Sequence, residues 1–300
     1  MIKRLFNQTM GGYYMYRALG AVVPRIPPWL GYPLFGFVGW LFFYLFRDAR
    51  EPLRANLRHV MAGAAPAEID ATARRTLRNH LRNYYDFFRA TRLSAEQIKG
   101  MVEVHGLENL EHALSWGKGV IFVSAHFGNI DIVGQTFVLN GYRVTIPAEH
   151  VKPEILFQEI VGVRASKGIR IIPVDGPLMA LMRALKKNEL IGLAADLDVT
   201  GSGMTVDMFG APACLPDGYA QLALKTGAAI LPAFSLRKPD NTFAAFAEPA
   251  VQIPKTGDYE ADVRAGVECV VKVMEKWIGE HPDQWVFFHR IWDRAEKQNG

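Results

Sequence analysis

The sequence has few cysteines and few charged residues, and both deficits limit what the protein can be. Cys214 and Cys269 are the only cysteines, and their separation is not that of metal ligands. A disulfide-stapled secreted fold is therefore excluded, and the thiols suit a reducing compartment. Charged residues make up 21% of the chain and hydrophobic residues 50%, which excludes an intrinsically disordered protein.

Several catalytic motifs are also missing from the sequence. Without a G-x-S-x-G elbow, a serine α/β-hydrolase would lack its nucleophile. Walker A and G-x-G-x-x-G motifs are absent too, which argues against P-loop and dinucleotide-binding enzymes. The histidines show no zinc-ligand spacing.

Length and net charge indicate one large domain, or one domain with an appendage. A chain of 300 residues can bury a substantial core. The formal net charge of +4 is too small to indicate nucleic-acid binding. A mildly basic protein suits an anionic membrane surface or an acidic carrier protein as its partner.

A long uncharged stretch lies near the amino terminus. Residues 29–46 read WLGYPLFGFVGWLFFYLF and would span roughly 27 Å as a helix, just short of a hydrocarbon core of about 30 Å. Pro33 and three glycines weaken a straight transmembrane helix, and arginines on both flanks indicate no orientation. We expect membrane association, either spanning or shallow. The alternative is a buried apolar hairpin of a soluble protein.

A basic and aromatic helix is predicted over residues 65–90. Five arginines and four aromatic residues in its later turns form either a solvated basic face or a surface for phospholipid headgroups. Leu93-Ser94-Ala95-Glu96 then has the pattern of a new helix start. We therefore predict a membrane-associating region over residues 1–95 and a catalytic domain over residues 96–300.

Strand and helix patterns alternate from residue 101 onwards, which predicts an α/β domain whose central sheet is mainly parallel and flanked by helices. An irregular loop is expected between the strand that ends at residue 195 and the helix that begins at residue 217. The predicted strands are residues 102–105, 119–125, 143–146, 169–173, 190–195, 229–234 and 242–246. The predicted helices are residues 107–116, 130–139, 153–166, 178–187, 217–226 and 259–279.

His126 follows the apolar strand in residues 119–134, which read GVIFVSAHFGNIDIVG. Open α/β sheets hold their active sites at such strand ends. If His126 lies on the turn before the next helix, Asp131 could accept one imidazole N–H and leave the other nitrogen as a base. Amides at the helix start could also stabilise an oxyanion or bind phosphate. The alternative is a capping arrangement with His126 as a core residue.

Two further groups could carry chemistry. Asp196 and Asp198 end another apolar strand, where they could hold a divalent cation, order the glycine-rich turn after them or pair with Arg164. Arg164, late in a predicted helix, could clamp a phosphate bidentately or be a surface charge.

The motifs, taken in order, resemble those of one bacterial family. SAHFGNID matches an H-x-x-x-x-(D/E) block, and Arg164 with Gly168 matches an R-x-x-x-G block. The remaining matches are Asn56-Leu57-Arg58, Asp196-Leu197-Asp198, Phe209-Gly210, Pro216-Asp217-Gly218, Ile230-Leu231-Pro232, and residues 281–285 and 289–292. Over nearly its whole length the chain is similar to the bacterial lipid A late acyltransferases and the related phosphatidylinositol mannoside acyltransferases, within the lysophospholipid acyltransferase superfamily.

The resemblance implies a glycerol-3-phosphate acyltransferase-like fold and a role for each matching residue. His126 would be the general base and Asp131 the acid that supports its imidazolium, while Arg164 would place a phosphate or stabilise the oxyanion. Asn129, Asp198 and Gly210 occupy family positions at which we expect substrate binding. Some relatives carry a glutamate shortly before the F-G pair; here Thr205 stands there, which leaves open which acid orients His126.

The resemblance therefore predicts a membrane-associated O-acyltransferase on the cytoplasmic face of the inner membrane. It would move a fatty acyl chain from acyl carrier protein or coenzyme A to a hydroxyl of a glycolipid or lysophospholipid, without a metal or further cofactor and without nucleic acid. Two other classes stay open. One is a metal-dependent glycosyltransferase using Asp196 and Asp198, and the other is a non-catalytic lipid-binding protein.

Overall fold

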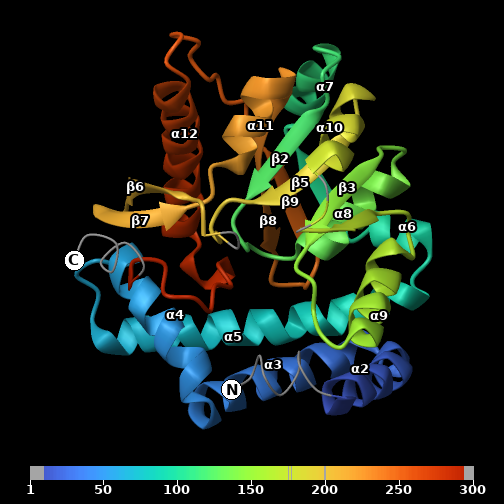
Figure 1. The fold of residues 1–300 in the computed structure, drawn as a ribbon. Helices are drawn as coiled ribbons and strands as arrows, with labels where there is room; N and C mark the ends of the chain where they lie inside the picture. The colour runs from blue at the N-terminus through green and yellow to red at the C-terminus, as the bar shows by residue number, and fades with distance from the viewer. Residues whose placement is uncertain (1–9, 175, 177, 199–200, 294–300) are drawn as a thin grey trace.

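The amino-terminal part of the chain is a layer of helices beneath a central sheet (Figure 1). The structure, a computed structural model, describes residues 10–174, 176, 178–198 and 201–293. The layer contains α2 (Met10–Val22), η1 (Val23–Arg25), α3 (Pro28–Leu45), α4 (Arg47–Val60) and α5 (Pro66–Arg89). It continues through η2 (Ala90–Arg92) and α6 (Ala95–Lys99) into the sheet.

A seven-stranded sheet forms the centre of the molecule, in the order β1-β9-β8-β2-β5-β3-β4. Its pairs are parallel except for β8 with β9, so the predicted α/β fold with a mainly parallel sheet is confirmed. The strands are β1 (Val102–His105), β2 (Val120–Ser124), β3 (Val144–Ala148), β4 (Arg170–Pro173), β5 (Leu190–Ala194), β8 (Ala229–Arg237) and β9 (Phe243–Ala247).

Helices cover both faces of this sheet, and α5 runs across the carboxyl ends of its central strands (Figure 1). The core strand β2 is buried as expected, since Val120, Ile121 and Val123 are fully enclosed. The covering helices are α7 (Leu107–Ser115), α8 (Ile130–Leu139), α9 (Glu154–Ala165), α10 (Leu178–Lys186), α11 (Gly218–Thr226) and α12 (Tyr259–Glu280), followed by η3 (Pro282–Gln284).

The segment predicted as an irregular loop contains a two-stranded hairpin. Strands β6 (Met204–Met208) and β7 (Ala211–Leu215) pair antiparallel, and Met208 lies opposite Ala211. The two residues between them have positive φ, 52° at Phe209 and 73° at Gly210, as a tight type I′ turn requires. The prediction missed the hairpin because Met204-Thr205-Val206-Asp207-Met208 alternates too briefly to be distinguished from a loop.

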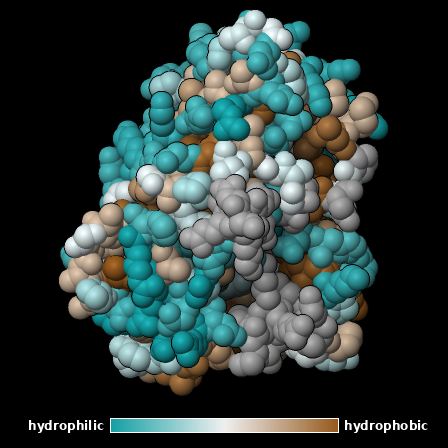
Figure 2. All heavy atoms as spheres, turned by 60° about the vertical axis from the view of Figure 1, so that its left-hand side comes forward, coloured by the Kyte–Doolittle hydropathy of each residue, from teal (hydrophilic) through white to brown (hydrophobic). Residues whose placement is uncertain are grey.

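The apolar stretch forms one helix, α3, which packs along α5 through its glycines. A Cβ added at Gly39 would lie 2.5 Å from the backbone oxygen of Leu77, so only glycine permits this approach. Among the described helices, α3 alone is long and apolar enough to cross a membrane, and only 28% of it is buried. Its outer side chains include the exposed Trp29, Phe37 and Trp40. At the level of α3 to α5, the face in Figure 2 is mostly hydrophilic, with hydrophobic residues at its lower margin. The domain boundary near residue 95 stays a prediction.

Candidate functional site

His126 lies beyond the carboxyl end of β2, beside Asp196 beyond the end of β5. The two strands are parallel neighbours, and Ser124 lies opposite Ala194. Each side chain follows its strand by two residues, so the register carries them to the same place. The distance from His126 Nδ1 to Asp196 Oδ1 is 2.7 Å, and the His126 backbone N–H donates to Asp196 Oδ2 at 2.8 Å.

The surroundings of Asp196 keep it ionised. Its side chain is fully buried, whereas that of His126 is 38% exposed. Burial alone would raise the pKa of Asp196, but the charge and hydrogen bonds of His126 and the indole N–H of Trp285, 2.9 Å from Oδ2, hold it below its usual value. Because an ionised carboxylate only accepts hydrogen bonds, the proton of neutral His126 lies on Nδ1. Nε2 is then the basic nitrogen of the ring.

Asp131 has a different partner from the one that the sequence predicted. Its Oδ1 accepts a hydrogen bond from Arg164 Nε at 2.7 Å, and its Oδ2 lies 3.4 Å from Nη2. The charge of Asp131 is the main cause that raises the pKa of Arg164. The predicted Nδ1 partner of His126 is thus corrected to Asp196, because strand register brings Asp196 to the ring while the first turn of α8 directs Asp131 towards α9.

Asn129 is a buried cap at the start of α8. Its Oδ1 accepts from the Ile132 N–H at 3.2 Å, its Nδ2 lies 3.4 Å from an oxygen of Asp86, and the residue is 3% exposed. The backbone N–H of Asn129 donates to Ser235 Oγ at 3.0 Å. These contacts give Asn129 a structural role in the turn, and substrate binding by this residue stays a prediction.

The carboxyl-terminal segment holds the turn around His126 in place. The Gly128 N–H donates to the Gln284 carbonyl at 2.9 Å, and the Val286 N–H donates to the His126 carbonyl at 2.8 Å. Asn56 in turn bonds the carbonyls of Phe287 and His289 at 3.2 and 2.8 Å. The motifs near residues 56 and 281–292 therefore support one turn, although they are far apart in sequence. The backbone N–H groups of His126, Gly128 and Asn129 already donate hydrogen bonds within the protein, so these three are not available as oxyanion donors.

Asp198 and Gly210 have local structural roles in the loop after β5. The carboxylate of Asp198 accepts from the backbone N–H groups of Gly201 and Gly203 at 2.9 and 3.0 Å. This bears out the alternative that it orders the glycine-rich turn. Gly210 is exposed at the hairpin tip, where its N–H donates to Asp207 at 3.0 Å. Substrate binding by either residue stays a prediction.

The same geometry argues against a metal site on Asp196 and Asp198. Both oxygens of Asp196 accept hydrogen bonds from His126 or Trp285, and both oxygens of Asp198 accept from backbone N–H groups. Across the described residues, no group of three or more His, Cys, Asp or Glu side chains is arranged to hold a metal ion.

Helix α5 contributes a histidine, His80, that the sequence did not single out. The His80 ring lies 5.0 Å from that of Tyr84 and 4.9 Å from that of Phe288. Burial and, to a smaller extent, the nearby charge of His126 together lower the pKa of His80 to about 4. His80 is therefore neutral near pH 7. Spacing along α5 places it on the face of Tyr84, but nothing in the sequence relates that face to His126.

Comparison with known proteins connects this geometry to one family. A sequence model described as bacterial lipid A biosynthesis acyltransferase matches residues 3–294. The chain is 34% identical over 189 residues to the phosphatidylinositol mannoside acyltransferase of Mycobacterium tuberculosis, covering 61% of this chain and 60% of that protein. It is 35% identical over 187 residues to the enzyme of that name from Mycolicibacterium smegmatis, with 61% of each chain covered.

More distant similarity extends to proteins of lipid A synthesis. The chain is 25% identical over 197 residues to the lipid A biosynthesis palmitoleoyltransferase of Escherichia coli, covering 65% of this chain and 62% of that protein. The chain thus spans about three fifths of the length of the curated relatives that it matches. These matches confirm the resemblance predicted from the ordered motifs.

Proposed function

Because the chain belongs to the bacterial lipid A biosynthesis acyltransferase family, we propose that it transfers a fatty acyl group from an acyl thioester to a hydroxyl of a glycolipid or lysophospholipid. The observation that carries the proposal is the His126–Asp196 pair at adjacent strand ends, with Nδ1 and Oδ1 2.7 Å apart. The half-exposed imidazole can meet a substrate, while its partner is shielded from water. This is how a general base is oriented and kept in one tautomer.

In the proposed reaction, Nε2 of His126 takes the proton of the acceptor hydroxyl as its oxygen attacks the thioester carbonyl carbon. Asp196 stabilises the imidazolium that forms. When the C–S bond breaks, the imidazolium returns the proton to the departing thiolate, so the products are an ester and a free thiol. The donor is acyl carrier protein or coenzyme A, and no other cofactor takes part.

Arg164 is the cation proposed to face the substrate. Asp131 holds its guanidinium at Nε and Nη2, which orients the side chain, and the Arg164 side chain stays 27% exposed. A guanidinium held in this way can place a phosphate of the acceptor or stabilise charge on the thioester oxygen.

We further propose that α3 seats the enzyme on the cytoplasmic face of the inner membrane. One side of α3 packs against α5 at Gly31 and Gly39, so that side contacts protein rather than lipid. The opposite side presents Trp29, Phe37 and Trp40, the ring types that favour the membrane interface. An interfacial helix of this kind would bring a lipid acceptor to the sheet edge without crossing the bilayer.

The test is transfer of a labelled acyl chain by detergent-solubilised protein to a panel of glycolipid and lysophospholipid acceptors. Acyl-carrier-protein and coenzyme A thioesters serve as alternative donors. His126→Ala should abolish transfer, because it removes the nitrogen proposed to take the hydroxyl proton. Lys118→Ala, an exposed change at the far end of β2, is the matched control and should retain activity. Full transfer by His126→Ala would leave a non-catalytic lipid-binding protein as the better interpretation.

A further inference from the structure

A positively charged hollow lies beside α5. It measures about 260 Å³, far more than the roughly 30 Å³ that a water molecule occupies. At about 100° per residue, its α5 arginines project opposite to His80 and Tyr84. The charged side chains that line it are Arg75, Arg78, Arg82, Arg237, Lys238 and Asp283.

The charge of the hollow is not balanced by its own walls. Asp283 is the one acidic residue among those lining it, and its carboxylate already accepts a hydrogen bond from Asn79 at 3.1 Å. Lys238 reaches Glu103, outside the hollow, at 3.2 Å. Burial lowers the pKa of Arg82, and the charges of Arg78 and Arg237 lower it further, as expected where cations are crowded together.

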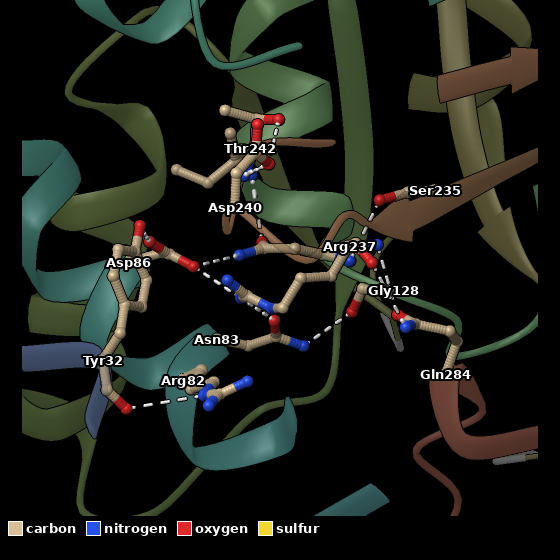
Figure 3. A network of polar contacts seen from close by, with 12 residues as sticks. Tyr32, Arg82, Asn83, Asp86, Gly128, Ser235, Arg237, Asp240, Thr242 and Gln284 are labelled. Atoms are coloured by element: carbon tan, nitrogen blue, oxygen red, sulfur yellow. Dashed lines mark hydrogen bonds and ion pairs between the residues drawn. The ribbon is translucent and has the colours of Figure 1, made fainter. Parts of the chain in front are cut away.

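Arg237 forms the floor of the hollow, where it is ion-paired with the buried Asp86, so it offers the hollow hydrogen-bond donors rather than net charge. Its side chain is 2% exposed and bonds Asp86 and Asn83 through Nη2 (Figure 3). Its Nε and Nη1 have no hydrogen-bond acceptor among the described residues. Buried donors without acceptors are rare in proteins, so these two N–H donors are available to an acceptor oxygen of a ligand.

The hollow is also next to the helix proposed to meet the membrane. Arg82 Nε donates to the backbone oxygen of Tyr32 in α3 at 3.4 Å, and a Cβ at Gly36 would contact the same guanidinium. On its other side, Asn83 joins Arg237 to the catalytic turn by donating to the Gly128 carbonyl at 2.6 Å (Figure 3).

We propose that this hollow is a phosphate-binding site separate from the catalytic centre, which takes the phosphate of a phospholipid headgroup or free inorganic phosphate. Guanidinium groups suit phosphate because they donate several hydrogen bonds in one plane. A bound phosphate offsets the crowded charges, and through Arg237 and Asn83 it stabilises the turn that carries His126.

The first measurement is the thermal midpoint of the full chain in inorganic phosphate and in chloride at equal ionic strength. Phosphate should raise the midpoint of the wild type and of Arg17→Gln/Arg25→Gln, and raise that of Arg75→Gln/Arg78→Gln much less. Each double variant removes two exposed arginines from the amino-terminal helices, so the two variants lose the same amount of positive charge. An equal response to phosphate and chloride in the wild type would overturn the site, as would an unchanged phosphate response in Arg75→Gln/Arg78→Gln.

The second measurement identifies the source of the phosphate, using phosphatidylcholine vesicles with and without phosphatidylglycerol. If lipid is the source, Arg75→Gln/Arg78→Gln should bind the anionic vesicles about tenfold more weakly than the control pair. If both pairs bind these vesicles equally while phosphate stabilises only the control, the ligand is free phosphate. His126→Ala, which should lose acyl transfer, should keep the phosphate response and the vesicle binding of the wild type, so the site and the proposed reaction can fail independently.

Discussion

Replacing Asp196 by asparagine tests the proposed base directly, because the substitution changes the tautomer of His126 while keeping the shape of its partner. Oδ2 of Asp196 accepts two N–H groups, from the His126 backbone at 2.8 Å and from Trp285 at 2.9 Å. The amide oxygen of asparagine should therefore occupy this position, which places its NH₂ at the position of Oδ1. That NH₂ then donates to Nδ1, so the imidazole proton moves to Nε2.

This change of tautomer should lower the rate of acyl transfer. A neutral His126 with its proton on Nε2 cannot accept the hydroxyl proton there, and no carboxylate remains to stabilise the imidazolium. The analogous change in Ser-His-Asp enzymes lowers kcat by roughly 10⁴. We expect a loss of about 10³ to 10⁴, which corresponds to about 4 to 5.5 kcal/mol of transition-state stabilisation. Raising the pH should not restore the rate, since the neutral ring is already in the wrong tautomer.

The assay is steady-state transfer of a labelled acyl chain, with kcat and KM measured separately and the thermal midpoint as a folding check. Asp131→Asn is the control, because it weakens the contact with Arg164 but leaves the 2.7 Å bond from His126 to Asp196. It should raise KM for a phosphate-bearing acceptor more than it lowers kcat. The reasoning is refuted if Asp196→Asn keeps a third or more of the wild-type kcat, or if Asp131→Asn has the larger effect on kcat.

Two further predictions concern stability, both measured by urea unfolding. The pKa of His80 is about 4 in the fold, below the usual value of about 6.5, so the unfolded chain binds more protons between these values and stability falls as the pH drops through this range. Between pH 7.5 and pH 5 the free energy of unfolding should fall by up to about 2 kcal/mol less in His80→Phe than in the wild type. This is an upper value because the His80 side chain is half-buried. An equal fall in both proteins would contradict the prediction. Gly39→Ala should destabilise by about 1–3 kcal/mol, since its Cβ would meet the Leu77 backbone at 2.5 Å. Gly162→Ala in α9, with open space around the new Cβ, should be neutral or stabilising by up to about 1 kcal/mol, and a similar loss in both variants would refute the packing argument.

The strands and helices of the sheet could be predicted because their patterns depend on neighbouring residues. Apolar runs such as Val120 to Val123 identify buried strands wherever they lie in the sheet. The order of the strands is different, because it depends on which faces pack together over long sequence separations. The sequence indicated that Asp196 and His126 both follow buried strands, but not that β2 and β5 are neighbours. Sequence proximity therefore favoured Asp131.

The positively charged hollow beside α5 could not be predicted for the same reason. The basic and aromatic pattern of residues 65–90 left a solvated face and a headgroup surface equally open. Only the packing of Arg237, Lys238 and Asp283 beside α5 shows that Arg75 and Arg78 line a hollow. Helical spacing predicted which arginines share a face, and tertiary structure determined what that face contacts.

The histidine and the aspartate of the H-x-x-x-x-D motif make two separate contacts at the start of α8. His126 lies before the helix and faces the end of β5, whereas Asp131 lies in the first turn and faces Arg164 on α9. Five residues are an awkward spacing for a direct pair but a natural one for side chains that point to different neighbours. Since Asp196 already supplies a buried carboxylate to the imidazole, the position of Thr205 in β6 has no need of an acid. The two acids therefore have different roles, because Asp196 orients the proposed base whereas Asp131 orients the cation proposed to meet the substrate.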